Sequence, residues 1–498
     1  MGACGWWDGQ TLTRSATAER LEGGRADFRF AGRGSGTHIE GMCRLPSVLC
    51  VALFALSSYA VVWAAPPNII FLLGDDHRAD ALGCMGNKII QTPHIDGLAR
   101  DGVLFENTFV TTSICAVSRA SIFSGQYARR HGITNFVTPF TPEQWARTYP
   151  AVLRSAGYRT GFIGKFGVGD KNPEPKEAFD YWRGFRGQGK YETTDEAGNY
   201  IHLTQVMENQ ALEFLRGCDG SKPFCLSVSF KAPHCQDGDP RQFIADRRDE
   251  GLYADVTIPP PPVGEDKYFE MFPEFFRVNN EARKRWEIRF STPDKYQEMV
   301  KGYFRLITGL DRAVGAILRE LKQRGLDQNT VVIYTGDNGF YLGEHGLAGK
   351  WYGHEESIRV PMVIHDPRLP AERRNRRLRQ NALNIDIAPT ILAMAGTTVP
   401  PEMQGRDLGP LLRGETPLWR TEFFYEHNVP IKTLRMTEGI AGGRYKYLRY
   451  SEPEPPWEEL YDLQSDPREI NNLAADPARR DLLETMRARW AELRKAAE

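Results

Sequence analysis

The segment Asn68-Ile69-Ile70-Phe71-Leu72-Leu73-Gly74-Asp75-Asp76-His77 joins an apolar run to two adjacent carboxylates. A continuous apolar run that ends at a glycine is typical of a strand buried on both faces of a sheet. Two neighbouring carboxylates at its end would repel each other unless a cation lies beside them, although aspartates also build solvated turns. Carboxylate oxygens favour calcium or magnesium. The segment therefore predicts a buried strand that ends in either a polar turn or a metal site.

Three further apolar segments repeat this form along the chain, at residues 158–163, 224–230 and 331–334. Helix-like sequence lies between the segments, at residues 149–156, 205–215 and 310–321. This alternation, from residue 68 to about 395, predicts an α/β domain with a mostly parallel central sheet flanked by helices. Polar residues follow every strand: Asp75 and Asp76, Lys165, Lys231 and His234, Asp337 and Asn338. Because ligands bind at the carboxyl ends of such strands, we expect these residues to share one site.

The end of the chain differs in its pattern. After residue 412, short alternating segments separated by turns predict an antiparallel sheet, and residues 477–497 predict an amphipathic helix. We therefore expect a catalytic α/β domain at 66–412 and a smaller C-terminal α+β subdomain at 413–498. Within the first domain, residues 171–205 are interpreted as a long loop and residues 236–300 as an insertion without a clear period.

The first 65 residues are predicted to lie outside the folded domains. Residues 1–41 are rich in Gly, Arg and Thr and indicate a disordered segment or an unused upstream start. Residues 42–65 combine a positive start, an apolar run and a small-residue exit, which is typical of a secretory signal peptide. A membrane anchor is the alternative, since the run approaches the ~20 residues that a span needs. We expect export to the periplasm or the extracellular space, without stable membrane insertion.

Composition excludes several classes of protein. The 498 residues carry a formal net charge of −1, with 41% hydrophobic and 26% charged residues, so there is no basic field for nucleic acid and no sign of disorder. A chain of this length exceeds one hydrophobic core. The eight cysteines are scattered and form no CxxC pair, which argues against a disulfide scaffold and against a structural zinc site.

A second segment, Cys115-Ala116-Val117-Ser118-Arg119, continues with Ala120-Ser121 and ends in Ser124-Gly125. It is interpreted as a loop that enters a helix. Cys115 would lie in the first turn, where backbone N–H groups and the helix dipole favour a negative group. Arg119 would follow one turn later on the same side. The segment predicts a place that holds an anion against a nucleophile, or simply a buried cysteine at a helix start.

This segment resembles the signature of the type I, formylglycine-dependent sulfatases of the alkaline-phosphatase-like superfamily. The resemblance covers most of residues 67–475, and Val117 departs from it because the family usually has proline there. It implies a hydrolase of sulfate esters, in which a formylglycine-generating enzyme oxidises Cys115 to the formylglycine whose hydrate attacks sulfur. Export and an aromatic-rich insertion, whose side chains would either stack on sugars or form ordinary core, suggest that the substrate is a sulfated carbohydrate or another sulfated small molecule.

The resemblance also implies a role for each matching position. One divalent cation, normally calcium, would be held by Asp75, Asp76, Cys115, Asp337 and Asn338. The implied catalytic positions are Cys115, Arg119, Lys165, His234 and Lys350, of which Lys165, His234 and Lys350 would bind the sulfate group. Physical chemistry agrees, because a divalent ion polarises sulfuryl oxygens and fixed cations stabilise the charge of the transition state.

Several positions keep more than one interpretation. Gly167 stands where the family commonly has the histidine that deprotonates the second hydroxyl of formylglycine. Two candidates to replace it, each otherwise structural, are His131 and His345. His77, Arg78 and Asp80 would either line the substrate pocket or form its rim. Lys231 is either a site residue or a solvated loop lysine. The alternative functions are a phosphodiesterase or phosphonate monoester hydrolase of the same superfamily, and a catalytically impaired homologue that binds sulfate esters.

Overall fold

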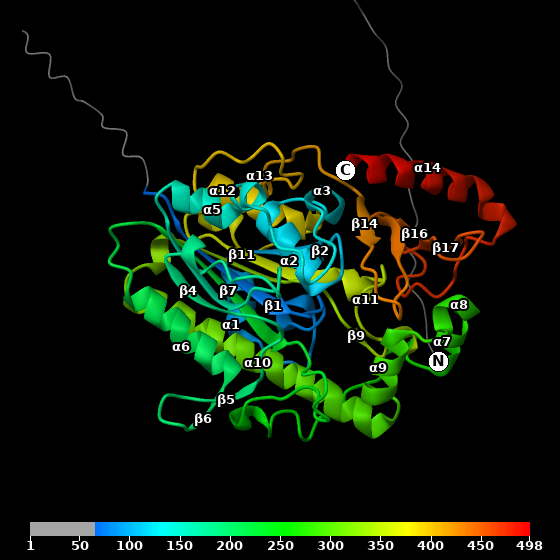
Figure 1. Cartoon of the computed structure of the whole chain (residues 1–498), viewed down its shortest axis with the longest axis horizontal. Coiled ribbons are helices and arrows are strands. Elements are labelled where there is room, and N and C mark those ends of the chain that lie inside the picture. Colours follow the sequence, from blue (N-terminus) through cyan, green and yellow to red (C-terminus); the bar gives the residue numbers. More distant parts are fainter. Residues whose placement is uncertain (1–64) are drawn as a thin grey trace, which may run out of the picture. The chain divides into compact units, whose positions relative to one another are not determined.

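The computed structural model describes residues 65–498 (Figure 1). The predictions for residues 1–41 and for the signal peptide at 42–65 therefore lie outside the described residues, except for its last residue. Within the described part of the chain, no helix is both long and apolar enough to cross a bilayer.

A nine-stranded mixed sheet forms the centre of the fold. Eight strands follow one another in the order β12-β2-β11-β8-β1-β7-β3-β4, and β13 also pairs with β2. The strands are β1 (Asn68–Asp75), β2 (Val103–Phe109), β3 (Arg159–Lys165), β4 (Tyr181–Phe185), β7 (Phe224–Pro233), β8 (Thr330–Gly336), β11 (Arg359–His365), β12 (Arg376–Leu378) and β13 (Ala382–Leu383). Only β11 runs antiparallel to its neighbours, so the predicted, mostly parallel α/β fold is confirmed.

Two layers of helices cover the two faces of this sheet (Figure 1). Alternate residues of β1 belong to different hydrophobic cores: Ile70 and Leu72 to one, Ile69 and Phe71 to the other. The first core contains α1 (Pro93–Asp101), α6 (Leu203–Arg216) and α10 (Pro293–Gln323). The second contains α2 (Cys115–Ser124), α5 (Tyr149–Ser155) and α12 (Ile387–Met394). Burial on both faces explains the continuous apolar run that β1 shows in the sequence.

The two segments without a clear period contain short elements. Residues 236–300 hold α7 (Asp266–Glu270), α8 (Glu274–Arg277), α9 (Glu281–Arg289) and the start of α10, and residues 171–205 hold β4, β5 (Glu192–Thr194) and β6 (Tyr200–His202). Helices of four to nine residues span too few turns to show a period of 3.6. The remaining short elements are α3 (Ala128–His131), α4 (Pro142–Trp145), β9 (Tyr341–Leu342), β10 (Ala348–Gly349), α11 (Glu355–Ile358) and α13 (Gly409–Leu412).

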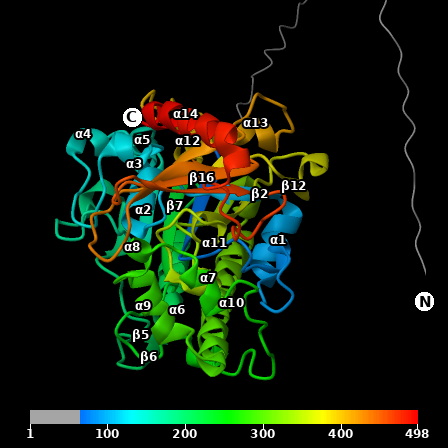
Figure 2. The same ribbon diagram turned by 90° about the vertical axis from the view of Figure 1, so that its right-hand side faces the viewer.

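The predicted antiparallel sheet near the end of the chain is present. It consists of β14 (Phe423–His427), β15 (Thr437–Ala441), β16 (Tyr445–Tyr450) and β17 (Trp457–Asp462). Helix α14 (Arg480–Ala496) lies along one face (Figure 2), where Leu483 and Met486 pack against Ile440. On the other face, Tyr425 shares a core with Trp351, next to Lys350. The predicted domain boundary at 412/413 falls between α13 and β14 and stays a prediction.

Candidate active site

The carboxyl ends of four adjacent strands bring the polar residues together. In the sheet order β8-β1-β7-β3, Asp337 and Asn338 follow β8, Asp75 and Asp76 lie at the end of β1, His234 follows β7, and Lys165 ends β3. Helix α2 adds Cys115 and Arg119, and Lys350 directly follows β10. All nine predicted site residues are at most 5% exposed, and hydrogen bonds or ion pairs join each one to another member.

Cys115 is the first residue of α2, as the sequence predicts. Its Sγ lies 3.4 Å from Asp75 Oδ1 and 3.1 Å from Lys350 Nζ. Burial, reinforced by Asp75, raises the pKa of the Cys115 thiol to about 12. The side chain therefore sits at a positive helix end, between a carboxylate and an ammonium group, but as a thiol it would keep its proton at neutral pH.

Three carboxylates of the site are each paired with a cation. Lys165 Nζ lies 2.6 Å from Asp75 Oδ2, and Arg119 Nε lies 2.8 Å from Asp337 Oδ2. The third pair joins Lys350 to Asp76. Burial acts to raise the pKa of Asp75, but Lys165 foremost lowers it well below its usual value. Burial raises the pKa of Asp337 to about 6, assisted by Asp75, so that this carboxyl is ionised at neutral pH.

The cluster has the donor atoms of a metal site. One ligand atom from each of Asp75, Asp76, Cys115 and His234 lies within 4.8 Å of the others. Two further observations point to a cation: Asp76 Oδ2 and Asn338 Oδ1 are buried and have no hydrogen-bond partner among the described residues. The cluster shares Asp75, Asp76 and Cys115 with the predicted ligand set and adds His234. Asp337, another predicted ligand, accepts a hydrogen bond from the Asp76 N–H through Oδ1 at 3.0 Å. Buried acceptors without donors fit a bound cation.

His234 presents an acceptor to this cluster. Its Nδ1 lies 2.6 Å from the Cys235 carbonyl oxygen, so Nδ1 carries the proton, and Nε2 lies 3.5 Å from Asp76 Oδ2. Burial, followed by the charge of Lys350, lowers the pKa of His234 well below its usual value. The ring is therefore neutral, and its free Nε2 faces the same space as the unpartnered carboxylate oxygen.

Arg119 occupies the space beside Gly167. Its Nη1 donates to the Lys165 carbonyl oxygen and to Ser229 Oγ. Gly167 has a φ of +75°, and a Cβ at this position would lie 2.9 Å from Arg119 Cδ. A side chain at residue 167 would therefore need both a strained backbone and a displaced arginine.

Neither candidate histidine hydrogen-bonds to any of the nine site residues in the described part of the chain. The ring nitrogens of His131 are used by Ser121 Oγ, at 3.0 Å, and by the Ile133 N–H, at 3.0 Å. His345 stacks on His354, with ring centroids 4.8 Å apart. His345 and His354 belong to a second group of ionisable residues, which lies between residues 343–358 and the antiparallel sheet and is buried except at Glu355. We call it the junction cluster: His345, His354, Glu355, Lys446, Glu459 and Glu469.

The residues that follow Asp75 and Asp76 differ in their environment. His77 is fully buried, and its Nδ1 lies 2.5 Å from the Tyr334 hydroxyl, so it is a core residue and does not line a pocket. Arg78 pairs with Asp80 and, at 2.9 Å, with Glu344. Arg78 and Asp80 line a surface cavity of about 510 Å³.

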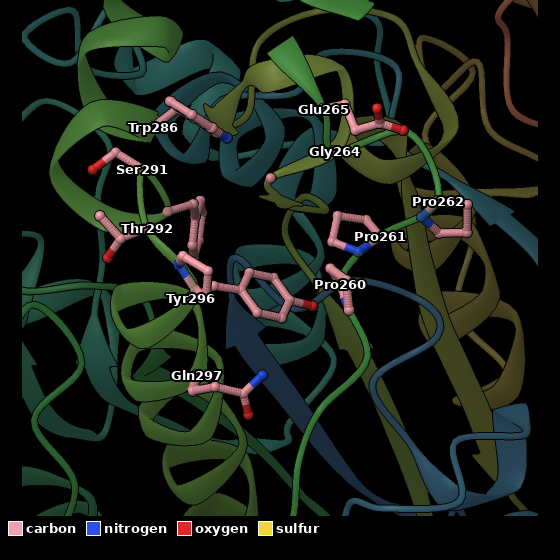
Figure 3. Close-up of a pocket in the computed structure, with 13 residues that line it drawn as sticks. Pro260, Pro261, Pro262, Gly264, Glu265, Trp286, Ser291, Thr292, Tyr296 and Gln297 are labelled. Atoms are coloured by element: carbon pink, nitrogen blue, oxygen red, sulfur yellow. The ribbon is translucent and has the colours of Figure 1, made fainter.

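A separate hollow of about 460 Å³ lies next to that cavity (Figure 3). Pro260, Pro261, Trp286 and Tyr296 form part of its wall, and the Tyr296 side chain points toward the prolines (Figure 3). None of the nine predicted site residues lines either space. Trp286 of the aromatic-rich insertion therefore lines a surface hollow and does not contact the cluster around Cys115. Three other aromatic residues of the same insertion are buried in a hydrophobic core: Phe269, Phe272 and Phe276.

Sequence reasoning missed two residues that contact the site. Gln188 Oε1 lies 2.7 Å from Lys165 Nζ, and Ser229 accepts from Arg119. Gln188 lies between two glycines with φ of +64°. A Gly-Gln-Gly turn presents one polar side chain, and this pattern could have indicated Gln188 from the sequence. Ser229 lies inside β7 and carries no such signal.

Comparison with known proteins agrees with this geometry. Residues 67–397 match the family model described as Sulfatase, and residues 343–496 match the one described as N-sulphoglucosamine sulphohydrolase, C-terminal. The chain is 30% identical over 502 residues to an N-acetylglucosamine-6-O-sulfatase of Bacteroides thetaiotaomicron, covering 86% of this chain and 87% of the relative. It is 29% identical over 509 residues to the human N-sulphoglucosamine sulphohydrolase, covering 90% and 93%.

A solved structure shares the same fold. It is an enzyme in complex with its substrate D-glucosamine-2-N,6-O-disulfate, with a TM-score of 0.72 and 27% identity, covering 87% of this chain and 98% of that chain. Fold and site together define a hydrolase of the alkaline-phosphatase-like superfamily. Within it, the chain belongs to the sulfatase family and is a sulfuric ester hydrolase.

Proposed function

We propose that the protein hydrolyses sulfate esters of a sulfated carbohydrate, using a formylglycine made from Cys115 and one bound calcium ion. The observation that supports this most is the position of Cys115 at the start of α2, between Asp75 at 3.4 Å and Lys350 at 3.1 Å. The unpartnered oxygens of Asp76 and Asn338 support the cation. The relatives named for glucosamine sulfates support a carbohydrate substrate.

The site residues would have two roles: some would bind the cation, and others would stabilise negative charge. Asp75, Asp76, Asp337, Asn338 and the modified residue 115 would hold the cation. When bound, the cation would polarise the sulfuryl oxygens, and the formylglycine hydrate would supply the hydroxyl that attacks sulfur and a second hydroxyl whose loss of a proton releases sulfate. The donor atoms that face one another in the cluster support the cation, and the roles of residue 115 are those that the resemblance to sulfatases implies.

The cationic side chains would stabilise the negative charge of the reaction. Lys350 contacts both Asp76 and Cys115, and Lys165 contacts Asp75. Each ammonium group would face a sulfuryl oxygen in a pocket that excludes water, where such groups are worth far more than in solution. Arg119, fixed by Asp337 and the Lys165 carbonyl, would hold residue 115 in place. In the neutral His234 ring, Nε2 is an acceptor, so it would contact an ester oxygen only after it takes up a proton, which it could then donate.

Two measurements test this function. Mass spectrometry of the Cys115 peptide, after expression with a formylglycine-generating enzyme, should show formylglycine despite Val117. Sulfate release from 4-nitrophenyl sulfate and from glucosamine 6-sulfates should then exceed turnover of a phosphate diester or phosphonate monoester. A preference for the phosphorus substrates would replace the proposal by the alternative hydrolase, and an unmodified thiol without turnover would support an impaired homologue.

We also propose export of the enzyme to the periplasm or the extracellular space. This rests on the sequence of residues 42–65, with its positive start, apolar run and small-residue exit. N-terminal sequencing of protein secreted from the native host should begin near residue 66. A mature chain that still contains residues 42–65 would contradict cleavage.

A further inference from the structure

Lys231 differs from the other buried lysines of residues 65–498. Four lysines are buried there, and three have carboxylate partners: Lys165 with Asp75, Lys350 with Asp76, and Lys446 with Glu355 and Glu469. Lys231 is 1% exposed, the same as Lys165, yet no carboxylate lies within ion-pair distance of it in the described part of the chain. A buried ammonium group without an anion is costly, so Lys231 calls for a negative partner.

The contacts that Lys231 does make place it beside the active site. Its Nζ lies 3.4 Å from the Cys235 carbonyl oxygen and 4.8 Å from the centre of the Tyr191 ring. The Tyr191 hydroxyl donates to the His234 carbonyl oxygen at 2.6 Å. Lys231 and the Tyr191 ring therefore adjoin the segment that carries the sulfate-binding histidine. A tyrosine face and one long hydrogen bond are weaker partners for a cation than a carboxylate.

When the charges of the site are counted, on the basis of the proposed function, the positive charge of Lys231 has no negative counterpart. The carboxylates of Asp75, Asp76 and Asp337 balance Arg119, Lys165 and Lys350. The two charges of a calcium ion balance the sulfate ester and the deprotonated nucleophile, and His234 is neutral.

The charged side chains next to Cys235 do not change this balance of charges. Asp237 pairs with Arg285 and Arg289, and Glu281 pairs with Arg285. The charges of these two carboxylates balance those of the two arginines, so neither carboxylate is a spare anion for Lys231. One positive charge beside the site remains without a counterpart.

We propose that Lys231 binds a second anionic group, a sulfate or a carboxylate, which the substrate carries next to the sulfate ester that is cleaved. The substrate class is then a carbohydrate with at least two negative charges close together. Burial, followed by repulsion from Lys165, lowers the pKa of Lys231 to about 8. An anion bound beside the amine would favour its charged form, which is consistent with a residue that becomes fully ionised when the substrate arrives.

The first experiment compares three saccharides on the modified, calcium-loaded enzyme and on Lys231→Met. N-acetylglucosamine 6-sulfate carries one charge, N-sulfoglucosamine 6-sulfate adds a second sulfate, and a hexuronate 2-sulfate adds a carboxylate. We expect Lys231→Met to lower kcat/KM at least thirtyfold, mainly through KM, on one doubly charged saccharide, and about threefold on the singly charged one. The doubly charged saccharide that shows the larger loss of kcat/KM then tells whether Lys231 binds a sulfate or a carboxylate.

A matched variant controls for general loss of a lysine. Lys190 is exposed and precedes Tyr191 in the same loop, so Lys190→Met should leave all three rates unchanged. Equal losses on the three saccharides in Lys231→Met would place Lys231 on the scissile sulfate, and no loss would make it structural. Either result overturns the proposal. The melting temperature of each variant identifies a folding defect.

A binding measurement separates this proposal from the proposed function. In Cys115→Ala protein, which cannot turn over substrate, calorimetry with the three saccharides reports recognition alone. Adding Lys231→Met should weaken binding of a doubly charged saccharide at least tenfold more than binding of the singly charged one. If the enzyme released no sulfate but this difference held, the hydrolytic function would fail while the role of Lys231 stood. An unchanged ratio of affinities would overturn the role of Lys231 whatever the turnover.

Discussion

Two buried groups of ionisable residues lie close together in this molecule, and they balance their charges differently. In the group around Cys115, each of three carboxylates has its own cation. In the junction cluster, Lys446 is the cation that pairs with both Glu355, at 2.9 Å, and Glu469, at 2.8 Å. Among residues 65–498, Glu459 has no lysine or arginine partner, and the basic group within ion-pair distance is His354, at 3.7 Å.

The difference appears in the protonation of the two groups. Burial raises the pKa of Glu459 to about 8, reinforced by Glu469, and burial also raises the pKa of Glu469 to about 7. Burial lowers the pKa of His354 well below its usual value. The junction cluster therefore holds protons on these two glutamates near neutral pH.

In the group around Cys115, the pKa of Asp75 lies well below its usual value and that of Asp337 at about 6, while burial raises the pKa of Asp76 against the charge of Lys350. Burial of ionisable residues alone does not indicate chemistry. Unpartnered acceptors do not separate the two groups either, because Glu459 Oε1 of the junction cluster also lacks a hydrogen-bond partner within residues 65–498. The matched cations are what distinguish the group around Cys115.

Loss of a lysine from the catalytic group should abolish turnover. We expect Lys350→Met to lower kcat for 4-nitrophenyl sulfate by about 10³-fold or more, because a fixed cation facing the transition state typically contributes at least 10²–10³. Steady-state sulfate release with calcium present measures this. The melting temperature should fall less than in Lys446→Met, because a bound cation can replace Lys350 beside Asp76. Turnover within tenfold of the parent enzyme would remove Lys350 from the catalytic group.

Loss of the lysine from the junction cluster should instead reduce stability. Lys446→Met leaves Glu355 and Glu469 without their cation, and breaking a buried pair in this way costs about 3 kcal/mol. Glu469 can keep a proton, which limits the cost. Denaturant unfolding measures the change, and the exposed Lys432→Met is the control, expected within about 0.5 kcal/mol of the parent protein. Equal stability of the two variants would mean that Lys446 is not needed to balance the cluster.

The charge of Glu459 should make stability depend on pH. Its folded pKa of about 8 lies above the ordinary value of 4.5, so its stabilising contribution is complete below pH 4.5 and is lost as the pH rises through 8. Relative to the parent protein, Glu459→Gln should therefore gain about 2 kcal/mol in unfolding free energy between pH 6.5 and pH 9.

Denaturant curves at several pH values measure this gain. Glu458→Gln is the matched control, because burial would raise the pKa of Glu458 but its hydrogen bond from Arg487 lowers it, so this carboxyl does not titrate in the window. If Glu459→Gln followed the parent protein at every pH, Glu459 would be ionised throughout and the contrast between the two clusters would fail.

The two clusters also differ in how far the sequence predicts them. Asp75, Lys165 and Asp337 each follow an apolar strand, and the topology of a parallel sheet brings such positions to one edge. Hydrophobic runs therefore predicted both the fold and the convergence of these residues. The roles of Cys115 and Lys350 came from resemblance, because neither lies at the end of a strand of the central sheet.

The junction cluster gave no comparable signal. His354, Lys446 and Glu469 are far apart in the sequence, and each lies among other polar residues, as solvated side chains do. Their burial depends on the packing of the antiparallel sheet against residues 343–358, which local patterns do not encode. The full length of α10 was missed for a related reason, since its first turns lie in a segment of short helices that hides the period.

The smallest predicted effect concerns the space beside Arg119. Gly167 has a φ of +75° and Gly132 a φ of +71°, so an alanine at either position should cost about 1 kcal/mol through backbone strain. Around Gly132 a new Cβ would meet nothing within 4 Å, whereas at Gly167 it would lie 2.9 Å from Arg119 Cδ. We therefore expect Gly167→Ala, but not Gly132→Ala, to lower kcat by about tenfold, since it would shift Arg119, which we propose holds residue 115. Equal kcat values in the two variants would show that the position of Arg119 tolerates change, and that a histidine at residue 167 could fit after all.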